Sequence, residues 1–197
     1  DAAIKKGLLL LKRQEKINLS RDDLLAFSEF TMPDPAAPND VTKSTYEAAR
    51  FHKEVAKALE AVERGEITQL IFAMPPRHGK SQLATKNFAA WLSGRHPEWN
   101  IAVASYSDTM AEDMGADTRA IMTGTPFRQV FTDHKLRRGG TSKSNIQTDK
   151  GGRLVFVGRG GALTGRGADC FAEGTEVETP DGTKKIEDVR VGEKVLS

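Results

Sequence analysis

The sequence has one cysteine, few aromatic residues and no long apolar run. Because Cys170 is the single cysteine of 197 residues, no internal disulfide can form, which excludes the disulfide-rich secreted scaffolds. The cytoplasm is therefore the expected location. No apolar stretch approaches the roughly 20 residues that a membrane-spanning helix needs, so we expect no membrane among the partners.

An excess of either charge is also absent, but the charges are unevenly distributed. The 29 Lys and Arg residues and 27 Asp and Glu residues give a net charge of +2. Residues 170–197 contain 4 basic and 7 acidic residues, a net −3, which leaves +5 for residues 1–169. A mildly basic body suits a polyanionic partner. The change of sign at Cys170 indicates a boundary between two parts of the chain.

The first third of the chain has helical periodicity. Apolar residues between positions 2 and 30 predict helices with a break near residues 18–20. The Pro-rich stretch MPDPAAPND at 32–40 is expected to be a connector. A further helix is predicted over 44–64. Its apolar face is expected to comprise Phe51, Val55, Leu59 and Val62.

Strand and helix patterns then alternate. TQLIFAM (68–74) and NIAVASYS (100–107) are short apolar runs typical of buried parallel strands. KSQLATKNFAAWLSG (80–94) and residues 108–124 predict helices, each ending at a glycine. The order strand, helix, strand, helix predicts an α/β fold with a parallel sheet.

A hairpin is predicted further along, and short strands are predicted after Cys170. SNIQT and RLVFVGRG flank a Gly-containing turn at residues 149–152. After Cys170, TEVET is a predicted short strand, followed by a Pro-Asp-Gly turn at 180–182 and two more strand-like pieces. A segment of 28 residues buries little surface, so we expect it to be disordered or a loose hairpin until a partner completes its sheet.

The segment AMPPRHGKS (73–81) lies between a predicted strand and a predicted helix, where phosphate-binding loops occur. Gly79 lets the backbone approach phosphates, Lys80 would reach the β- and γ-phosphates, and the Ser81 hydroxyl would hold Mg²⁺. ATP and Mg²⁺ are thus the expected cofactors. The pattern G-x-x-x-x-G-K-[ST] lacks its first glycine, because Met74 occupies that position. A plain strand-to-helix turn, with Lys80 in solvent, is the alternative.

Two more loop residues belong to this hypothesis. Arg77 would stabilise charge at the γ-phosphate, as arginine fingers do. His78 is a spacer that completes the nucleotide-binding set. His52 lies upstream, and we assign it no role from the sequence alone.

Residues 44–169 resemble the ATPase domain of phage terminase large subunits. The resemblance is carried, in order, by MPPRHGKS, a second strand ending in ASYS, and GGALTGRGAD. The resemblance implies a DNA-packaging motor with a P-loop ATPase domain of the additional-strand, RecA-like class, followed by a metal-dependent nuclease domain. Gly79, Lys80 and Ser81 match its Walker A core. Arg77 matches its loop arginine, which some members place one position earlier. Implied partners are double-stranded DNA, the portal and the small terminase subunit, in the cytoplasm of the infected host.

The sequence after Asp169 departs from the terminase pattern. In that family an apolar strand ending in paired acids follows, and these acids coordinate Mg²⁺ and orient the attacking water. Here CFAEGTEVETPDG follows instead, and neither such a strand nor a nuclease domain is found. We therefore expect a helical region at 1–43 and an incomplete ATPase domain at 44–169 that hydrolyses ATP poorly.

CFAEGTEVETPDGTKKIEDVRVGEKVLS (170–197) resembles the first block of an intein, a short all-β Hint segment that Hedgehog-type autoprocessing domains share. The terminase-like context favours the intein. The resemblance implies that Cys170 attacks the carbonyl carbon of Asp169 and converts the peptide bond to a thioester. The Thr-x-x-His block and the terminal His-Asn are missing. We therefore expect either a split intein, completed in trans by its C-terminal half, or a sequence that stops within the intein.

Two other interpretations stay open. In one, Cys170 is non-reactive and the chain is a nucleotide-binding module. In the other, the chain belongs to another P-loop motor, such as a helicase.

Overall fold

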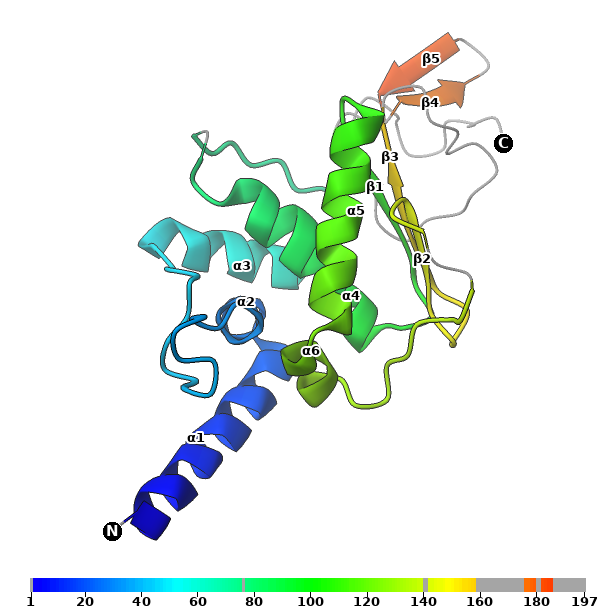
Figure 1. Cartoon of the computed structure of the whole chain (residues 1–197). Helices are drawn as coiled ribbons and strands as arrows, with labels where there is room; N and C mark the ends of the chain where they lie inside the picture. Colours follow the sequence, from blue (N-terminus) through cyan, green and yellow to red (C-terminus); the bar gives the residue numbers. More distant parts are fainter. Residues whose placement is uncertain (1, 76, 140–141, 159–175, 180–181, 186–197) are drawn as a thin grey trace. The chain divides into compact units, whose positions relative to one another are not determined.

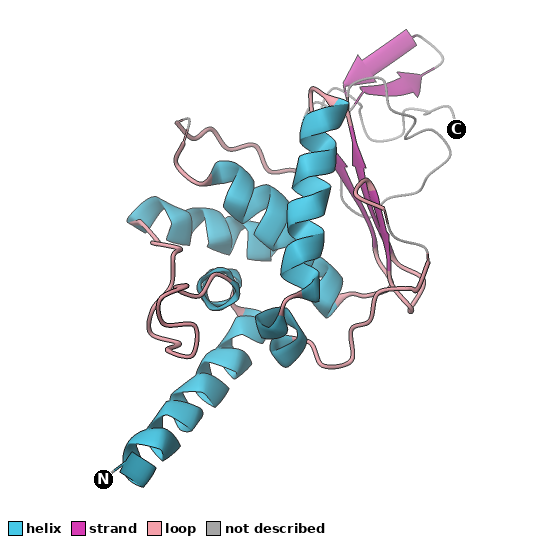
Figure 2. Ribbon diagram, viewed as in Figure 1, coloured by secondary structure: helices cyan, strands magenta, loops and turns pink. Residues whose placement is uncertain are grey.

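The protein is a mixed α/β chain in which helices predominate and strands are short (Figures 1 and 2). The computed structural model describes residues 2–75, 77–139, 142–158, 176–179 and 182–185. The helices are α1 (Ala2–Asp22), α2 (Leu24–Thr31), α3 (Arg50–Glu63), the π-helix η1 (Ser81–Asn87), α4 (Phe88–Arg95), α5 (Asp108–Thr123) and α6 (Thr125–Val130). The strands are β1 (Asn100–Ala104), β2 (Asn145–Gln147), β3 (Arg153–Val157), β4 (Glu176–Thr179) and β5 (Gly182–Lys185).

Two units make up the chain: residues 1–95 with 120–134, and residues 96–119 with 135–197. The predicted helices at 2–30, 80–94 and 108–124 are confirmed, with small shifts of their ends. None of the helices in the described part of the chain combines the length and the apolar character that a bilayer crossing requires.

Aromatic side chains form the core of the first unit. The Phe27 ring of α2 packs edge-on against Phe127 of α6, with ring centroids 6.1 Å apart, and lies 5.9 Å from Phe131. Trp91 of α4 is 1% exposed and donates its indole N–H to the Ser20 carbonyl oxygen at 3.2 Å. Burial of each such ring stabilises the fold by about 1.5–3 kcal/mol.

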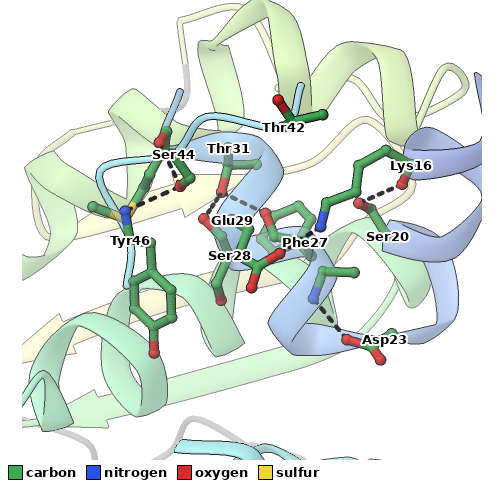
Figure 3. Close-up of polar contacts among 12 residues, drawn as sticks. Lys16, Ser20, Asp23, Phe27, Ser28, Glu29, Thr31, Thr42, Ser44 and Tyr46 are labelled. Atoms are coloured by element: carbon green, nitrogen blue, oxygen red, sulfur yellow. Dashed lines mark hydrogen bonds and ion pairs between the residues drawn. The ribbon is translucent and has the colours of Figure 1, made fainter. Parts of the chain in front are cut away.

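Helices α1 and α2 are separate because Asp23 caps α2. Its backbone is extended (φ −122°, ψ 113°), and its carboxylate accepts a hydrogen bond from the Ala26 amide at 2.6 Å (Figure 3). The break predicted near residues 18–20 is therefore wrong. Ser20 remains inside α1, where its hydroxyl donates to the Lys16 carbonyl oxygen at 2.7 Å, a bond that a helix accommodates.

The Pro-rich connector predicted at 32–40 is confirmed as a loop, and hydrogen bonds tie the chain that follows it to the end of α2. The Ser44 hydroxyl donates to the Met32 carbonyl oxygen at 2.8 Å and accepts from the Tyr46 amide at 3.0 Å (Figure 3). These bonds bring the Tyr46 side chain, 8% exposed, to the beginning of α3.

Helix α3 is shorter than predicted, and the face that it buries differs from the predicted apolar face. It begins at Arg50 rather than near residue 44, because Ala49 before it has an extended backbone (φ −74°, ψ 165°). Phe51, expected on the buried face, is 39% exposed. The buried face consists of His52, Ala56, Leu59 and Glu63. Two of these are polar with specific partners, so hydrogen bonding as well as hydrophobicity sets the orientation of the helix.

The strand predicted at 68–74 does not form, and this prediction is wrong. The segment is irregular, and Ile71 is 67% exposed. A strand requires a hydrogen-bonded neighbour, and none of the described strands pairs with these residues. The apolar composition predicted burial but contained no information on a pairing partner.

The second unit contains a three-stranded mixed sheet in the order β1-β3-β2. β1 and β3 are parallel, with Val103 opposite Phe156, and β2 is antiparallel to β3, with Ile146 opposite Leu154. The predicted hairpin is thus confirmed, and Gly151 adopts φ 94° in its turn. The strand predicted at 100–107 is confirmed only as far as residue 104.

After Cys170, a strand on each side of the predicted turn is present, and the two strands form a hairpin. β4 and β5 are antiparallel, with Glu176 opposite Lys185. Gly182, in the predicted Pro-Asp-Gly turn, has φ 112°, which a residue with a side chain rarely adopts.

Candidate functional site

The candidate site is the loop that precedes η1. Arg77 has φ 65° and Gly79 has φ 78°. Arg77 is the one non-glycine residue in the described part of the chain with a positive φ, a conformation that costs about 1–2 kcal/mol for a residue with a side chain. The Gly79 carbonyl oxygen accepts from the Leu83 amide at 2.9 Å, which joins the loop directly to the helical residues.

The predicted nucleotide-binding side chains lie together at this junction. Lys80 is the first helical residue, and Ser81 begins η1. The exposed side chains are those of Arg77, His78, Lys80 and Ser81. The structure therefore brings the predicted residues to one accessible loop at a helix N-terminus, where backbone N–H groups and the helix dipole favour an anion. The helix predicted after the loop is present, whereas the strand predicted before it is absent.

The His52 side chain of α3 anchors this loop. The His52 Nε2 atom lies 2.8 Å from the His78 carbonyl oxygen. On the other side of the ring, Nδ1 accepts a hydrogen bond from the Ala49 amide at 2.9 Å. His52 is 6% exposed, so the anchor is buried although the loop it holds is exposed.

The loop also approaches His52 more closely than a side chain at position 79 would permit. A Cβ atom placed on Gly79 would lie 3.0 Å from Nε2 of His52. Gly79 thus satisfies two requirements: a left-handed backbone and close contact with the imidazole.

Aromatic rings surround the His52 imidazole. The Phe51 and Tyr46 ring centroids lie 4.2 Å and 5.6 Å from that of His52. Burial, with a smaller contribution from the negative charge of Glu29, raises the pKa of Tyr46 to about 12. The Tyr46 hydroxyl has no hydrogen-bond partner among the described residues.

The helix after the loop begins with a wide turn. The Phe88 amide donates to the Leu83 carbonyl oxygen, the i to i−5 bond of a π-helix. Gln82 donates its side-chain N–H to Asn87 Oδ1 at 2.9 Å. π-Helical turns are rare and occur frequently at functional sites.

The donor set of the loop fits Mg²⁺ bound together with phosphates. Among the residues that the structure describes, no group of three or more His, Cys, Asp or Glu side chains could hold a metal on its own. Mg²⁺ typically takes one or two protein oxygens and completes its coordination with water and phosphate oxygens. The exposed hydroxyl of Ser81 fits such a role, and the exposed ammonium of Lys80 fits a phosphate.

The predicted splice junction lies elsewhere in the chain. Cys170 and Asp169 lie outside the described residues.

No role for His52 was predicted from the sequence. A local signal was available: His52 is the third residue of α3 and bonds back to the amide of Ala49, the residue that precedes the helix. In a capping box, a Glu or Gln side chain commonly makes this bond to the amide of the capping residue. The second contact, to a loop 26 residues further along the chain, has no local signature.

No protein-family model matches the chain, and comparison with curated proteins and with solved structures gives no significant match.

Proposed function

We propose that the chain is an ATP-binding fragment of a DNA-packaging terminase motor, joined at Cys170 to the N-terminal segment of an intein. The observation that carries the first part is the anchored loop. Gly79 lies against His52, and Lys80 and Ser81 emerge exposed at the start of the helical residues. Together with the resemblance of MPPRHGKS to a Walker A sequence, this geometry supports phosphate binding better than a plain connecting turn.

Three side chains of the loop would bind the nucleotide phosphates and Mg²⁺. Lys80 contacts the β- and γ-phosphates as a mobile point charge, and Arg77 stabilises charge at the γ-phosphate. The Ser81 hydroxyl would hold Mg²⁺, which would neutralise phosphate charge.

Lysine substitutions test the nucleotide-binding part. Lys80→Ala is expected to weaken Mg·ATP binding at least tenfold, because a charge-assisted contact to phosphate contributes about 1.5–3 kcal/mol. Lys86→Ala is the matched control, since Lys86 lies on the same helix, six residues beyond Lys80. Equal affinities of the two variants would reject the phosphate-loop assignment.

The second part of the proposal concerns the thiol. The Cys170 sulfur attacks the carbonyl carbon of Asp169, the C–N bond between the two residues breaks, and the freed amine of Cys170 takes up the proton. The acyl group then passes from the thioester to a nucleophile at the start of the downstream host segment. The β4–β5 hairpin supports this reading, because the intein-like block requires strands around its Asp-Gly turn.

Mixing the chain with a C-terminal intein half tests the thiol chemistry. With dithiothreitol present, the wild-type chain is expected to release a fragment ending at Asp169, detectable by intact-mass spectrometry. Cys170→Ala should abolish it. If both proteins give the same products, Cys170 is non-reactive, and the chain is a nucleotide-binding module at most.

An interrupted motor should also gain activity on ligation. None of the strands that the structure describes pairs with segment 68–74, and Ile71 is 67% exposed; both observations support a sheet that lacks a strand. Ligation would add the apolar strand with its paired acids. ATP turnover is therefore expected to rise after ligation to the downstream host segment, and equal rates before and after would contradict this.

A further inference from the structure

We infer that His52 is a positioning residue for the phosphate loop: its Nε2–H bond to the His78 carbonyl oxygen holds residues 77–80 in the conformation that receives phosphates. This inference rests on the proposed nucleotide-binding function. The direct evidence is the 2.8 Å distance between His52 Nε2 and the His78 oxygen, which joins α3 to the loop.

The hydrogen bonds of the ring define its tautomer. The Ala49 amide is a donor, so Nδ1 of His52, 2.9 Å away, must be the unprotonated acceptor. The proton of the neutral ring is therefore on Nε2, which faces the His78 carbonyl oxygen. A carbonyl oxygen accepts only, so both bonds are satisfied by this one tautomer.

Packing holds the ring in place. His52 is 6% exposed and lies against Phe51 and Tyr46, with centroids 4.2 Å and 5.6 Å away. Because the side chain is already confined, little further rotamer entropy is lost when it bonds to the loop. A rigid donor of this kind suits the task of orienting a backbone segment.

The part of the loop next to His52 needs such support. Arg77 precedes the anchored His78 and has the unfavourable φ of 65°, and Gly79 follows it with φ 78°. A strained conformation persists only where its surroundings over-determine it. Gly79 adopts a positive φ without strain, but Arg77 does not, and the bond to the His78 carbonyl oxygen next to Arg77 opposes its relaxation.

The same bonds argue against a direct role for His52 in recognising the nucleotide base. Both ring nitrogens are already engaged with backbone groups. A base could bond to this imidazole only after one of the two bonds had broken.

Two substitutions of His52 distinguish its bond to the Ala49 amide from its bond to the His78 carbonyl oxygen. In His52→Asn the side-chain oxygen occupies the place of Nδ1 and can still accept from the Ala49 amide, but the side chain is too short to reach the loop. In His52→Gln the longer amide can place an N–H near the position of Nε2 and restore the bond to the His78 oxygen. Loop positioning therefore predicts rescue by Gln and not by Asn.

The measurements are the Mg·ATP dissociation constant and the rate of tryptic cleavage after Arg77, which is exposed. For His52→Asn we expect about a tenfold weaker affinity and about a tenfold faster cleavage, the effect of losing one buried hydrogen bond. For His52→Gln both values should stay within about threefold of wild type. Thermal unfolding without nucleotide checks that both variants are folded.

Equal affinity and equal cleavage in the two variants would overturn the inference. Cleavage reports on the loop even when no nucleotide binds. If the wild-type chain binds no Mg·ATP but His52→Asn alone is cleaved faster, the anchor stands and the proposed nucleotide-binding function fails.

Discussion

Substitution of Gly79 by alanine perturbs the candidate site at its tightest point. The new Cβ atom would lie 3.0 Å from Nε2 of His52, tighter than nine in ten real Cβ contacts, on a backbone with φ 78°. Either the loop leaves the left-handed conformation or the imidazole moves away from the His78 carbonyl oxygen. Both responses disturb the conformation that we propose for phosphate binding.

The cost has two parts. Placing alanine in the left-handed region costs about 1 kcal/mol relative to glycine. Displacing His52 loses a hydrogen bond with a net value of about 1 kcal/mol. Together they amount to about 2 kcal/mol, which corresponds to about a 30-fold weaker affinity for Mg·ATP, since 1.4 kcal/mol is tenfold.

The assay is equilibrium titration with Mg·ATP, with Gly65→Ala as control. Gly65 has a similar φ of 74°, but nothing lies within 4 Å of its Cβ position. Gly65→Ala should lower the free energy of unfolding by about 1 kcal/mol and leave the affinity unchanged. The reasoning is refuted if Gly79→Ala binds as tightly as wild type, or if the control loses as much affinity.

Three further predictions concern the first unit. Gly94→Ala would place a Cβ atom 2.3 Å from ring carbons of Phe131, so overpacking should lower the free energy of unfolding, measured in urea, by about 3 kcal/mol. Glu63→Gln should lower the free energy of unfolding by about 2 kcal/mol in the same assay, because the Glu63 side chain is 4% exposed and pairs with Arg95 at 2.8 Å. The loss is limited because Arg95 keeps some solvent contact. The Tyr46 pKa is raised from 10.0 to about 12, so the contribution of the neutral hydroxyl to folding stability is complete below pH 10 and is lost as the pH rises through 12. Tyr46→Phe should therefore remove this loss of stability at high pH. Unfolding curves between pH 9 and 12 that match wild type would contradict this last prediction.

Elements with local signals were predictable from the sequence. The helix at 108–124 begins with capping residues and ends at a glycine, and α5 spans Asp108–Thr123. The hairpins around Gly151 and Gly182 follow from turn residues between short strands, and both glycines have a positive φ. Short-range hydrogen bonding determines these elements, so a short window of sequence contains the information.

Features that depend on distant residues were not predictable. The apolar run at 68–74 has the composition of a buried strand, yet its state depends on a pairing partner elsewhere in the chain. On α3, His52 and Glu63 are buried in place of the more hydrophobic Phe51, because His78 and Arg95 supply their partners. The accessible positions of Lys80 and Ser81 were expected from the motif, whereas their support from α3 was not.

Recognition of phosphates by residues 77–81 can be tested in a displacement experiment. The chain would be loaded with a fluorescent ATP analogue in the presence of Mg²⁺ and titrated separately with tripolyphosphate and with adenosine. Tripolyphosphate is expected to displace the analogue at concentrations where adenosine has no effect, because Lys80, Ser81 and the helix N-terminus all act on the phosphates. Displacement by adenosine but not by tripolyphosphate would contradict phosphate recognition.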